Sequence, residues 1–237
     1  MKTFLVLLSG GSGTRLKGVD IPKQYVLVKN KPILIYTLEK IDQVEAIDTV
    51  VAVSAPEWTD QIREWIKEFG ISKDIVYTVS GDNRQASILS GLKKCMELSE
   101  SPEDIVVIHD AVRPMTEPEL FMACINGVEE NVGCMSSYAS LDTMYFSNSG
   151  DQVDNIINRD LLYVGQTPEA YLLKDYYEIN AGASEEELKI TRGSSEIAYR
   201  HGMKIRLIAA DELNYKITTM KDLKRFEQNV WAEGENW

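Results

Sequence analysis

Short apolar segments rich in β-branched residues alternate along this chain with amphipathic segments. The apolar segments predict strands that helices cover on both faces, because such strands need almost no polar positions. They are Phe4–Leu8, Thr49–Ser54, Ile75–Val79, Ile105–His109, Cys134–Ala139 and Ile205–Ala209. Between them, apolar residues recur at helical spacing over Pro32–Gln43, Glu57–Phe69, Asn83–Leu98 and Glu117–Glu130. This alternation predicts an α/β fold with a mostly parallel central sheet.

Residues 141–166 interrupt the alternation. Strand-like stretches there flank a polar turn at Asn148–Asp151, which is typical of a β-hairpin with a loose loop. A hairpin that projects from a sheet has strand edges to cover, and pairing with a second subunit covers them. We therefore expect a dimerisation arm, with an ordinary surface loop as the alternative. No linker or internal repeat divides the chain, so residues 1–237 are expected to form a single domain.

Composition narrows the range of partners. The formal net charge is -12 and the pI is about 4.7, and such a field repels nucleic acid and anionic membrane surfaces. No segment approaches the roughly 20 apolar residues that span a bilayer. Cys95, Cys124 and Cys134 lack the spacing of a disulfide framework or a zinc site, which favours a reducing compartment, the cytoplasm. An anionic small molecule is still a compatible ligand wherever cations gather locally.

The first expected strand leads directly into a glycine-rich loop, SGGSGTR. Strand, glycine-rich loop and helix form an arrangement in which backbone N–H groups converge on phosphate oxygens. Gly10, Gly11 and Gly13 allow close approach, and Arg15 and Lys23 add positive charge. The spacing matches neither the P-loop nor the dinucleotide fingerprint, so a P-loop kinase and a dehydrogenase are disfavoured. The alternative is a flexible turn with solvated cations.

A second polar segment, SGDNRQAS at residues 80–87, opens a helix after a strand. Asp82 or Asn83 is expected to cap this helix. Arg84 and Ser87 lie one turn apart near its N-terminus, a combination that suits an anionic ligand. Helix caps are common, so this motif alone is weak.

A third segment, HDAVRP at residues 109–114, ends a buried strand. Ligands of open α/β sheets gather at the carboxyl ends of strands, and an aspartate such as Asp110 is able to hold Mg2+ there against phosphate oxygens. The alternative is a turn in which Asp110 pairs with Arg113, and His109 is expected to be structural. Lys216 precedes an expected terminal helix, and taken alone it is a solvated lysine.

Together these segments resemble one protein family, in the order in which that family has them. They are GGSGTR with IPKQY, then GDNRQASILSGL, HDAVRP, LDT, GQTPE and NYKITT, and the resemblance covers about residues 4 to 228. The family is that of the cytidylyltransferases that make CDP-polyols, which includes the 2-C-methyl-D-erythritol 4-phosphate and ribitol-5-phosphate enzymes. The resemblance implies a Rossmann-like nucleotidyltransferase fold, a homodimer joined by the β-arm at about 141–166, Mg2+, CTP as co-substrate and release of pyrophosphate.

The resemblance also implies roles for individual residues. The implied triphosphate cradle consists of Gly10, Gly11, Gly13, Arg15 and Lys23. The implied cytidine pocket consists of Gly81, Asp82, Arg84 and Ser87, and the implied metal ligand is Asp110. The acceptor phosphate is assigned to Arg113, Thr143, Thr167 and Thr191, with Arg159 offered by the second subunit's arm. The implied catalytic cations are Arg15, Lys23 and Lys216.

Departures from the family pattern bear on the acceptor. Methylerythritol enzymes usually have an aspartate where this chain has Arg192, and another where it has Leu213. The acidic stretch ASEEELKI and the stretch before Lys216 resemble the ribitol-type branch instead. We therefore expect a linear pentitol phosphate as acceptor, with 2-C-methyl-D-erythritol 4-phosphate as the alternative. More remote alternatives are a sugar-1-phosphate nucleotidyltransferase that uses another NTP and a non-catalytic nucleotide-binding regulator.

Overall fold

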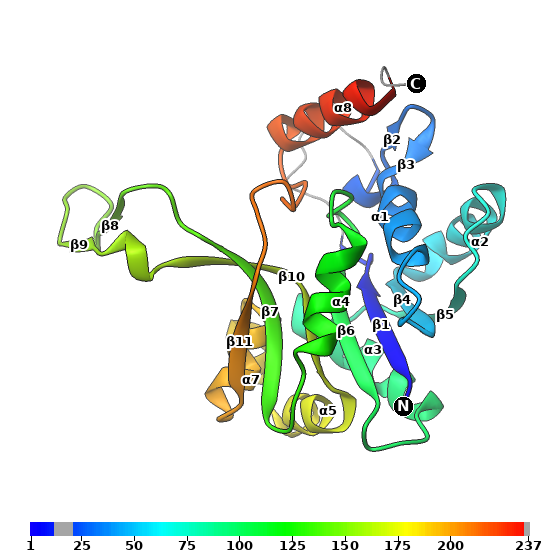
Figure 1. Ribbon diagram of the computed structural model, residues 1–237, viewed down its shortest axis with the longest axis horizontal. Helices are drawn as coiled ribbons and strands as arrows, with labels where there is room; N and C mark the ends of the chain where they lie inside the picture. Colours follow the sequence, from blue (N-terminus) through cyan, green and yellow to red (C-terminus); the bar gives the residue numbers. More distant parts are fainter. Residues whose placement is uncertain (12–20, 235–237) are drawn as a thin grey trace.

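The computed structural model describes residues 1–11 and 21–234 and confirms an α/β fold built on a mostly parallel sheet (Figure 1). The sheet has seven strands in the order β11-β7-β10-β6-β1-β4-β5. Their bounds are β1 Thr3–Leu8, β4 Thr49–Ser54, β5 Asp74–Val79, β6 Ile105–Asp110, β7 Val132–Ala139, β10 Tyr163–Leu172 and β11 Lys204–Ala209. The expected strands are all present, with ends that differ by one or two residues.

Strand β10 is the strand of this sheet that the hydrophobic pattern missed. It pairs antiparallel with both β6 and β7, whereas β1, β4, β5 and β6 are parallel to one another and β11 is parallel to β7. Its register on β7 shifts between Gly165 and Glu169, so the polar residues Gln166 and Thr167 occupy an irregular stretch. A strand interrupted by buried polar residues carries neither a continuous apolar run nor a strict alternation.

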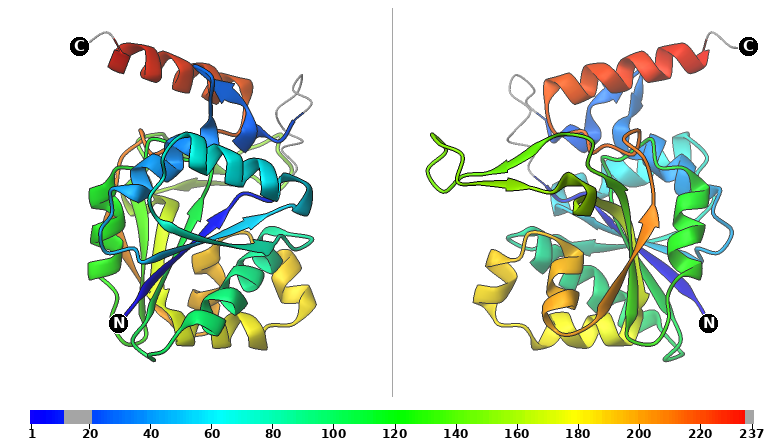
Figure 2. Two further views of the ribbon diagram at one scale, coloured as in Figure 1. Left: turned by 90° about the vertical axis from the view of Figure 1, so that its right-hand side faces the viewer. Right: turned by 60° about the vertical axis from the view of Figure 1, so that its left-hand side comes forward.

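Helices cover both faces of the sheet (Figure 2). One apolar core joins β1, β4 and β6 to α1, α2 and α4, and the core on the opposite face joins the sheet to α3, α5 and α7. The helix bounds are α1 Ile33–Asp42, α2 Thr59–Glu68, α3 Arg84–Leu98, α4 Pro118–Asn126, α5 Leu173–Gly182, α6 Glu185–Ile190, α7 Ser194–Arg200 and α8 Met220–Gly234. Single 3-10 turns are η1 Lys23–Tyr25, η2 Pro56–Trp58 and η3 Arg159–Leu161.

A third, smaller core lies beneath the C-terminal helix. Val28 and Ile33 pack there with Ile217 and with Leu223 and Phe226 of α8. The small hairpin of β2 (Leu27–Val28) and β3 (Lys31–Pro32) lies beside α8 in Figure 1. This core ties the segment that carries Lys216 to the connection that carries Lys23.

The expected hairpin is confirmed and projects well beyond the sheet (Figures 1 and 2). Strands β8 (Met144–Phe146) and β9 (Asn155–Ile157) pair antiparallel. Large apolar side chains along this arm are exposed: Leu141, Met144, Tyr145, Phe146, Val153, Ile156 and Leu161. Contiguous exposed apolar surface of this kind is typical of an interaction surface.

The topology determines where a ligand site forms. From β1 the chain goes to β4 on one side, and after β5 it returns through α3 to β6 on the other side. Ligands of open α/β sheets bind at such a reversal of strand order, outside the carboxyl ends of the strands. The ends of β1 and β6 are adjacent there, since Leu8 is in register with Asp110.

Candidate active site

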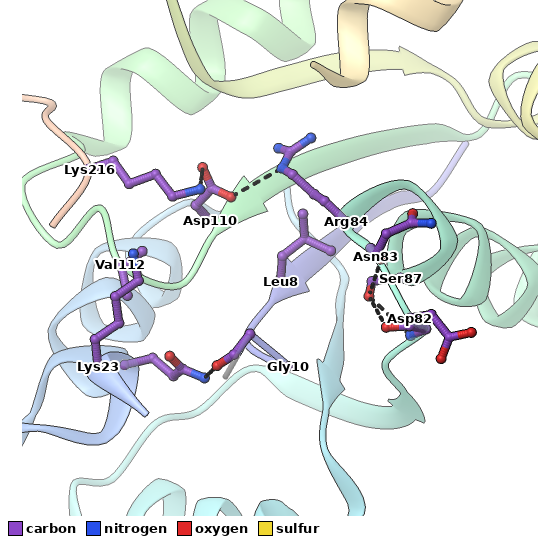
Figure 3. A pocket seen from close by; sticks show the side chains of 13 residues that line it. Leu8, Gly10, Lys23, Asp82, Asn83, Arg84, Ser87, Asp110, Val112 and Lys216 are labelled. Carbon is purple, nitrogen blue, oxygen red and sulfur yellow. Dashed lines mark hydrogen bonds and ion pairs between the residues drawn. The ribbon is translucent and has the colours of Figure 1, made fainter. Parts of the chain in front are cut away.

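A pocket of about 420 Å3 lies at this reversal point (Figure 3). It is lined by the loop after β1, by the N-terminal turn of α3, by the end of β6 and by the segment before α8. The lining residues that the sequence also indicated are Gly10, Gly11, Lys23, Gly81, Asp82, Arg84, Ser87, Asp110 and Lys216. Gly13 and Arg15 lie outside the described residues, so the structure gives no position for them.

The start of the glycine-rich loop is held by side chains that follow it in the sequence. The amide of Gln24 donates to the carbonyl of Gly11 at 2.8 Å, and the hydroxyl of Tyr25 donates to the carbonyl of Ser9 at 3.0 Å. Gly10 faces Ser80 so closely that a Cβ atom would overlap the serine side chain. Glycine at this position therefore sets the width of the pocket between β1 and the loop that leads to α3.

Lys23 is the first residue of the 3-10 turn η1 and is buried. Its Nζ donates to the carbonyl of Ile217 at 2.7 Å. This contact places the ammonium end of the Lys23 side chain beside the segment that carries Lys216. The two lysines, which are far apart in the sequence, thus line the same pocket.

The loop before α3 is built around Asn83 and Ser87. Asn83 is the N-cap and accepts from the N–H of Ala86 at 2.9 Å, as the sequence indicated. The Ser87 hydroxyl accepts from the N–H of Gly81 at 3.0 Å and donates to the carbonyl of Asn83 at 2.9 Å. A Cβ at Gly81 would meet Ala86 at 2.5 Å, so only glycine fits there. Ser87 therefore orders the turn in which Gly81 and Asp82 face the pocket.

In the described part of the chain, three cations surround the carboxylate of Asp110. Lys216 Nζ lies 3.0 Å from Oδ2, Arg113 Nε lies 3.4 Å from Oδ2, and Arg84 Nε lies 3.6 Å from Oδ1. Figure 3 shows Lys216 and Arg84 reaching Asp110 from opposite sides. Burial by itself opposes ionisation of Asp110, but the charges of Lys216, Arg84 and Arg113 outweigh it and hold its pKa well below the ordinary range. Among the described residues, positive charges therefore outnumber the single negative charge at the Asp110 cluster.

His109 is structural, as expected. It is fully buried, lies against Phe121, and contacts the hydroxyls of Thr167 and Thr116 at 3.1 and 3.4 Å. Burial lowers the pKa of this imidazole to about 3, and the nearby charge of Arg113 acts in the same direction against that of Asp110. The ring is neutral at physiological pH and does not line the pocket.

Two of the residues implied to hold the acceptor lie beside Asp110. The Asp110 N–H donates to the Thr167 hydroxyl at 3.2 Å, and Arg113 donates to the Asn214 carbonyl at 2.6 Å. Both side chains are buried and neither is part of the pocket lining. They stand behind the carboxylate, where they support it.

The other implied acceptor residues are dispersed in the described part of the chain. Thr143 and Arg159 are exposed on the arm, where Arg159 donates to the Leu141 carbonyl at 2.9 Å. Thr191 is buried after α6, and its hydroxyl donates to the Glu187 carbonyl. None of the three lines the pocket. One copy of the described chain thus does not bring together the residues that the family resemblance implies for the acceptor.

Asn214 is a supporting residue that sequence reasoning passed over, although it belongs to the NYKITT motif. Its side chain accepts from the Thr116 hydroxyl at 2.6 Å and donates to the Gln166 side chain and to the Thr167 carbonyl, both at 2.9 Å. Together with the bond from Arg113 to its carbonyl, these contacts attach the segment before Lys216 to the sheet. The signal in the sequence was that Asn214 lies two residues before Lys216 in this motif.

Comparisons with known proteins agree with this geometry. The family model described as IspD, 2-C-methyl-D-erythritol 4-phosphate cytidylyltransferase, matches residues 3–230. The chain belongs to this cytidylyltransferase family, whose members are nucleotidyltransferases. A crystal structure of the 4-diphosphocytidyl-2C-methyl-D-erythritol synthase from Anaerococcus prevotii matches with a TM-score of 0.80 and 25% identity, covering 97% of this chain and 96% of that one.

Curated relatives of this chain are named for ribitol 5-phosphate and not for 2-C-methyl-D-erythritol 4-phosphate. The ribitol-5-phosphate cytidylyltransferase of Lactiplantibacillus plantarum is 32% identical over 93% of this chain and 95% of its own length. The enzyme of the same name from Lacticaseibacillus paracasei is 34% identical, with 94% and 95% covered. Among the described residues, no helix is both long and apolar enough to cross a membrane.

Proposed function

We propose that this chain transfers CMP from CTP to a linear polyol phosphate, namely ribitol 5-phosphate, and releases pyrophosphate. The observation that carries the proposal is the pair Lys216 and Arg84 at Asp110 in a pocket bordered by Gly10 and Gly81, with Arg113 behind the carboxylate. Nucleotidyl transfer needs fixed cations around a triphosphate and a backbone that the phosphates can approach closely. This pocket offers both.

The chemistry uses an anionic nucleophile. A phosphate oxygen of the acceptor attacks the α-phosphorus of CTP in line, the new P–O bond forms, and the bond to the bridging oxygen breaks as pyrophosphate leaves. Because the nucleophile is already charged, the site needs positioning and positive charge more than a general base. Lys23 and Lys216 line the pocket and are the cations we assign to the developing negative charge, with Arg15 as a third by family resemblance.

The Asp110 carboxylate suits Mg2+ when substrate phosphates supply further ligands. No cluster of three or more metal-ligating side chains occurs among the described residues, and Mg2+ is commonly held by one or two carboxylates together with substrate phosphates and water. Asp110 is the residue we assign to this ion, which would neutralise phosphate charge when bound. Lys216 and Arg113 contact Oδ2 of this carboxylate at 3.0 and 3.4 Å, and both must share it with a bound ion.

The acceptor is inferred from two observations. The two curated relatives described above are named for ribitol 5-phosphate, and Arg192 and Leu213 depart from the methylerythritol pattern. In the structure Arg192 is exposed and Leu213 is 50% exposed, and neither lines the pocket. The solved structures that match are methylerythritol enzymes by name, so 2-C-methyl-D-erythritol 4-phosphate is the second candidate.

The deciding experiment compares acceptors under saturating CTP and Mg2+. We expect kcat/KM for ribitol 5-phosphate to exceed that for 2-C-methyl-D-erythritol 4-phosphate by at least about tenfold, since a site built to pair hydroxyls rejects an analogue that leaves them unpaired. Pyrophosphate release measures both rates. A preference for the branched substrate would reverse the acceptor assignment and leave cytidylyl transfer in place.

A second experiment tests the nucleotide. With the preferred acceptor, CTP should exceed ATP and GTP in kcat/KM by about tenfold or more, because a pocket that reads the base through backbone groups at Gly81 and Asp82 has no room for a purine. Equal turnover of the four common NTPs would favour a sugar-1-phosphate type of enzyme. Binding of CTP without any pyrophosphate release would favour a regulator.

We also propose that two copies assemble through the arm and that the protein works in the cytoplasm. The exposed apolar side chains of β8 and β9 support the dimer, and the dispersed acceptor residues call for a second subunit. The three cysteines are buried and free, which suits a reducing compartment. Ile156→Asp should shift the sedimenting species from dimer to monomer, whereas Leu27→Asp, at a residue 53% exposed away from the arm, should leave a dimer.

A further inference from the structure

A second buried carboxylate lies close to the Asp110 cluster. Glu169 belongs to β10 and is 4% exposed. Its Oε1 accepts from the Ser194 hydroxyl at 2.8 Å, and its Oε2 accepts from the Tyr171 hydroxyl. Burial raises the pKa of Glu169, although the nearby charge of Arg84 and both hydrogen bonds act to lower it. No step of the proposed reaction uses this carboxylate.

Arg84 connects the two carboxylates. Its Nη1 donates to the Ser194 hydroxyl at 3.0 Å, while its Nε lies 3.6 Å from Asp110 Oδ1. Burial by itself lowers the pKa of Arg84, but the charges of Asp110 and Glu169 outweigh burial and raise it. The guanidinium group therefore lies between two anions and, from the N-terminal turn of α3, lines the pocket.

The direction of the hydrogen bonds depends on the charge of Glu169. The Ser194 hydroxyl has one proton, and an ionised Glu169 can only accept it. The oxygen of Ser194 is then left as an acceptor for Arg84. A neutral amide at position 169 can donate instead, so it does not enforce this orientation.

Ser194 also belongs to a segment implied in acceptor binding. It is fully buried as the first residue of α7, three positions after Thr191. The Tyr176 hydroxyl donates to its carbonyl at 3.0 Å, which fixes its backbone on α5. Ser194 thus connects the Arg84 side chain to the segment that contains Thr191.

We propose that Glu169, acting through Ser194, is a positioning residue that holds Arg84 at the nucleotide pocket and couples this pocket to the segment of Thr191. The inference rests on the proposed function, because it takes Arg84 to be a residue that binds the nucleotide. Without the charge of Glu169, Arg84 retains its ion pair with Asp110 but loses the orientation that Ser194 gives it.

The first test reads Arg84 directly in the ligand-free protein. Hydrogen exchange at the Arg84 Nε–H, followed by NMR, should accelerate by about tenfold or more in Glu169→Gln and in Ser194→Ala, since each removes an interaction of the network. Glu178→Gln, an exposed glutamate on α5, is the matched control and should leave the rate unchanged. Unchanged exchange in both variants would overturn the proposal, whichever acceptor the enzyme uses.

The second test separates positioning from a merely structural role. The dissociation constant for CTP is measured by calorimetry in wild type, Glu169→Gln, Arg84→Ala and the double variant. We expect Glu169→Gln to weaken CTP binding by about tenfold in the wild-type background and by less than about twofold when Arg84 is already absent. Equal factors in the two backgrounds would mean that Glu169 acts on the fold alone. Ser194→Ala, which leaves the Glu169 side chain in place, repeats the cycle if the first variant folds poorly.

A failure of the proposed function is distinguishable from a failure of this inference. If wild-type protein releases no pyrophosphate from CTP with any acceptor, the proposed function fails, while Arg84 exchange still reports on Glu169. If wild type is active but neither exchange nor CTP affinity responds to Glu169→Gln, the inference alone fails.

Discussion

Lys216 Nζ and Asp110 Oδ2 lie 3.0 Å apart, although the two residues belong to distant segments of the chain. Asp110 ends β6, and Lys216 precedes α8, which a separate small core and Asn214 hold in place. The lysine whose local segment, taken alone, predicts a solvated side chain is therefore a partner of the carboxylate assigned to the metal. The Asp110 carboxylate is therefore able to pair either with Lys216 or with a bound metal ion, in the pocket where we expect the phosphates.

Asp110→Asn should separate the catalytic role of this carboxylate from its contribution to folding. Removing the negative charge leaves Lys216, Arg84 and Arg113 without their common anion, so we expect kcat to fall by roughly 100-fold or more. The matched control is Asp104→Asn, because Asp104 is also buried, immediately precedes the same strand, and accepts from the Ser99 hydroxyl. Both variants should melt at lower temperature, and only Asp110→Asn should lose pyrophosphate release. Comparable activity in the two would remove Asp110 from the reaction.

Lys23→Ala should act mainly on the chemical step. The cation faces charge that develops in the transition state, so kcat should fall by roughly 100-fold or more with a smaller change in CTP affinity. Because Lys23 also donates to the Ile217 carbonyl, some loss of stability is expected as well. Lys67→Ala, at an exposed site on α2, is the control for the loss of a lysine. Near-full kcat in Lys23→Ala would place the cradle on other residues.

Gly10→Ala tests the close approach of the loop after β1 to the loop before α3. The added Cβ overlaps the Ser80 side chain, so the two walls of the pocket must separate. We expect a lower melting temperature and a higher KM for CTP, with a destabilisation of about 1–3 kcal/mol. Removing the opposing side chain in Gly10→Ala/Ser80→Gly should recover most of the stability. A Cβ at Gly11 meets nothing within 4 Å, so Gly11→Ala should not lower the melting temperature by this mechanism.

His109 should make the fold sensitive to mild acid. Burial lowers its pKa from 6.5 to about 3, with the charge of Arg113 adding to this effect and that of Asp110 opposing it. Below pH 6.5 the unfolded chain therefore takes up a proton that the folded chain does not bind, and the free energy of unfolding falls. At pH 5 the expected loss is on the order of 2 kcal/mol. Denaturant unfolding of wild type and His109→Gln at pH 7.5 and pH 5 measures it.

The control for this experiment is His201→Gln, which removes the other histidine of the chain from an exposed site. His109→Gln should start from lower stability at pH 7.5 and lose less between the two pH values. An equal loss in wild type and His109→Gln would assign the acid sensitivity to the carboxylates. Among these, the pKa of Asp110 lies well below 3.8, so its contribution persists above that pH and is lost below it.

Arg192→Ala addresses the acceptor. Arg192 is exposed and follows Thr191. Its backbone N–H donates to Glu196 at 2.8 Å, and this bond does not involve its side chain. If it approaches the acceptor phosphate or a hydroxyl, its loss should raise the acceptor KM by about tenfold while CTP affinity stays unchanged. Steady-state kinetics with each substrate varied in turn separates the two constants. A change in CTP affinity alone would place Arg192 on the nucleotide side.

Local pattern was sufficient for much of the fold. The strands β1, β4, β5, β6, β7 and β11 and the helices α1 to α4 follow from apolar runs and helical periodicity, and Asn83 follows from cap chemistry. These features depend on residues that are close to one another in the sequence, so the sequence pattern is enough to predict them. The arm is a hairpin for the same reason, since its turn and both strands lie within a short stretch.

Tertiary structure decided the rest, because it depends on contacts between distant segments. Strand β10 is held between β6 and β7 by backbone pairing, and its buried polar residues are tolerated only because Ser194, Tyr171 and Asn214 satisfy them. The same long-range packing brings Lys216 and Arg84 to Asp110 and keeps Thr191 outside the pocket. Sequence motifs determined which residue types this protein has available for nucleotide chemistry. Which charges meet, and therefore which pKa values shift, was determined by the fold, because electrostatic energy depends on distance in space and on burial.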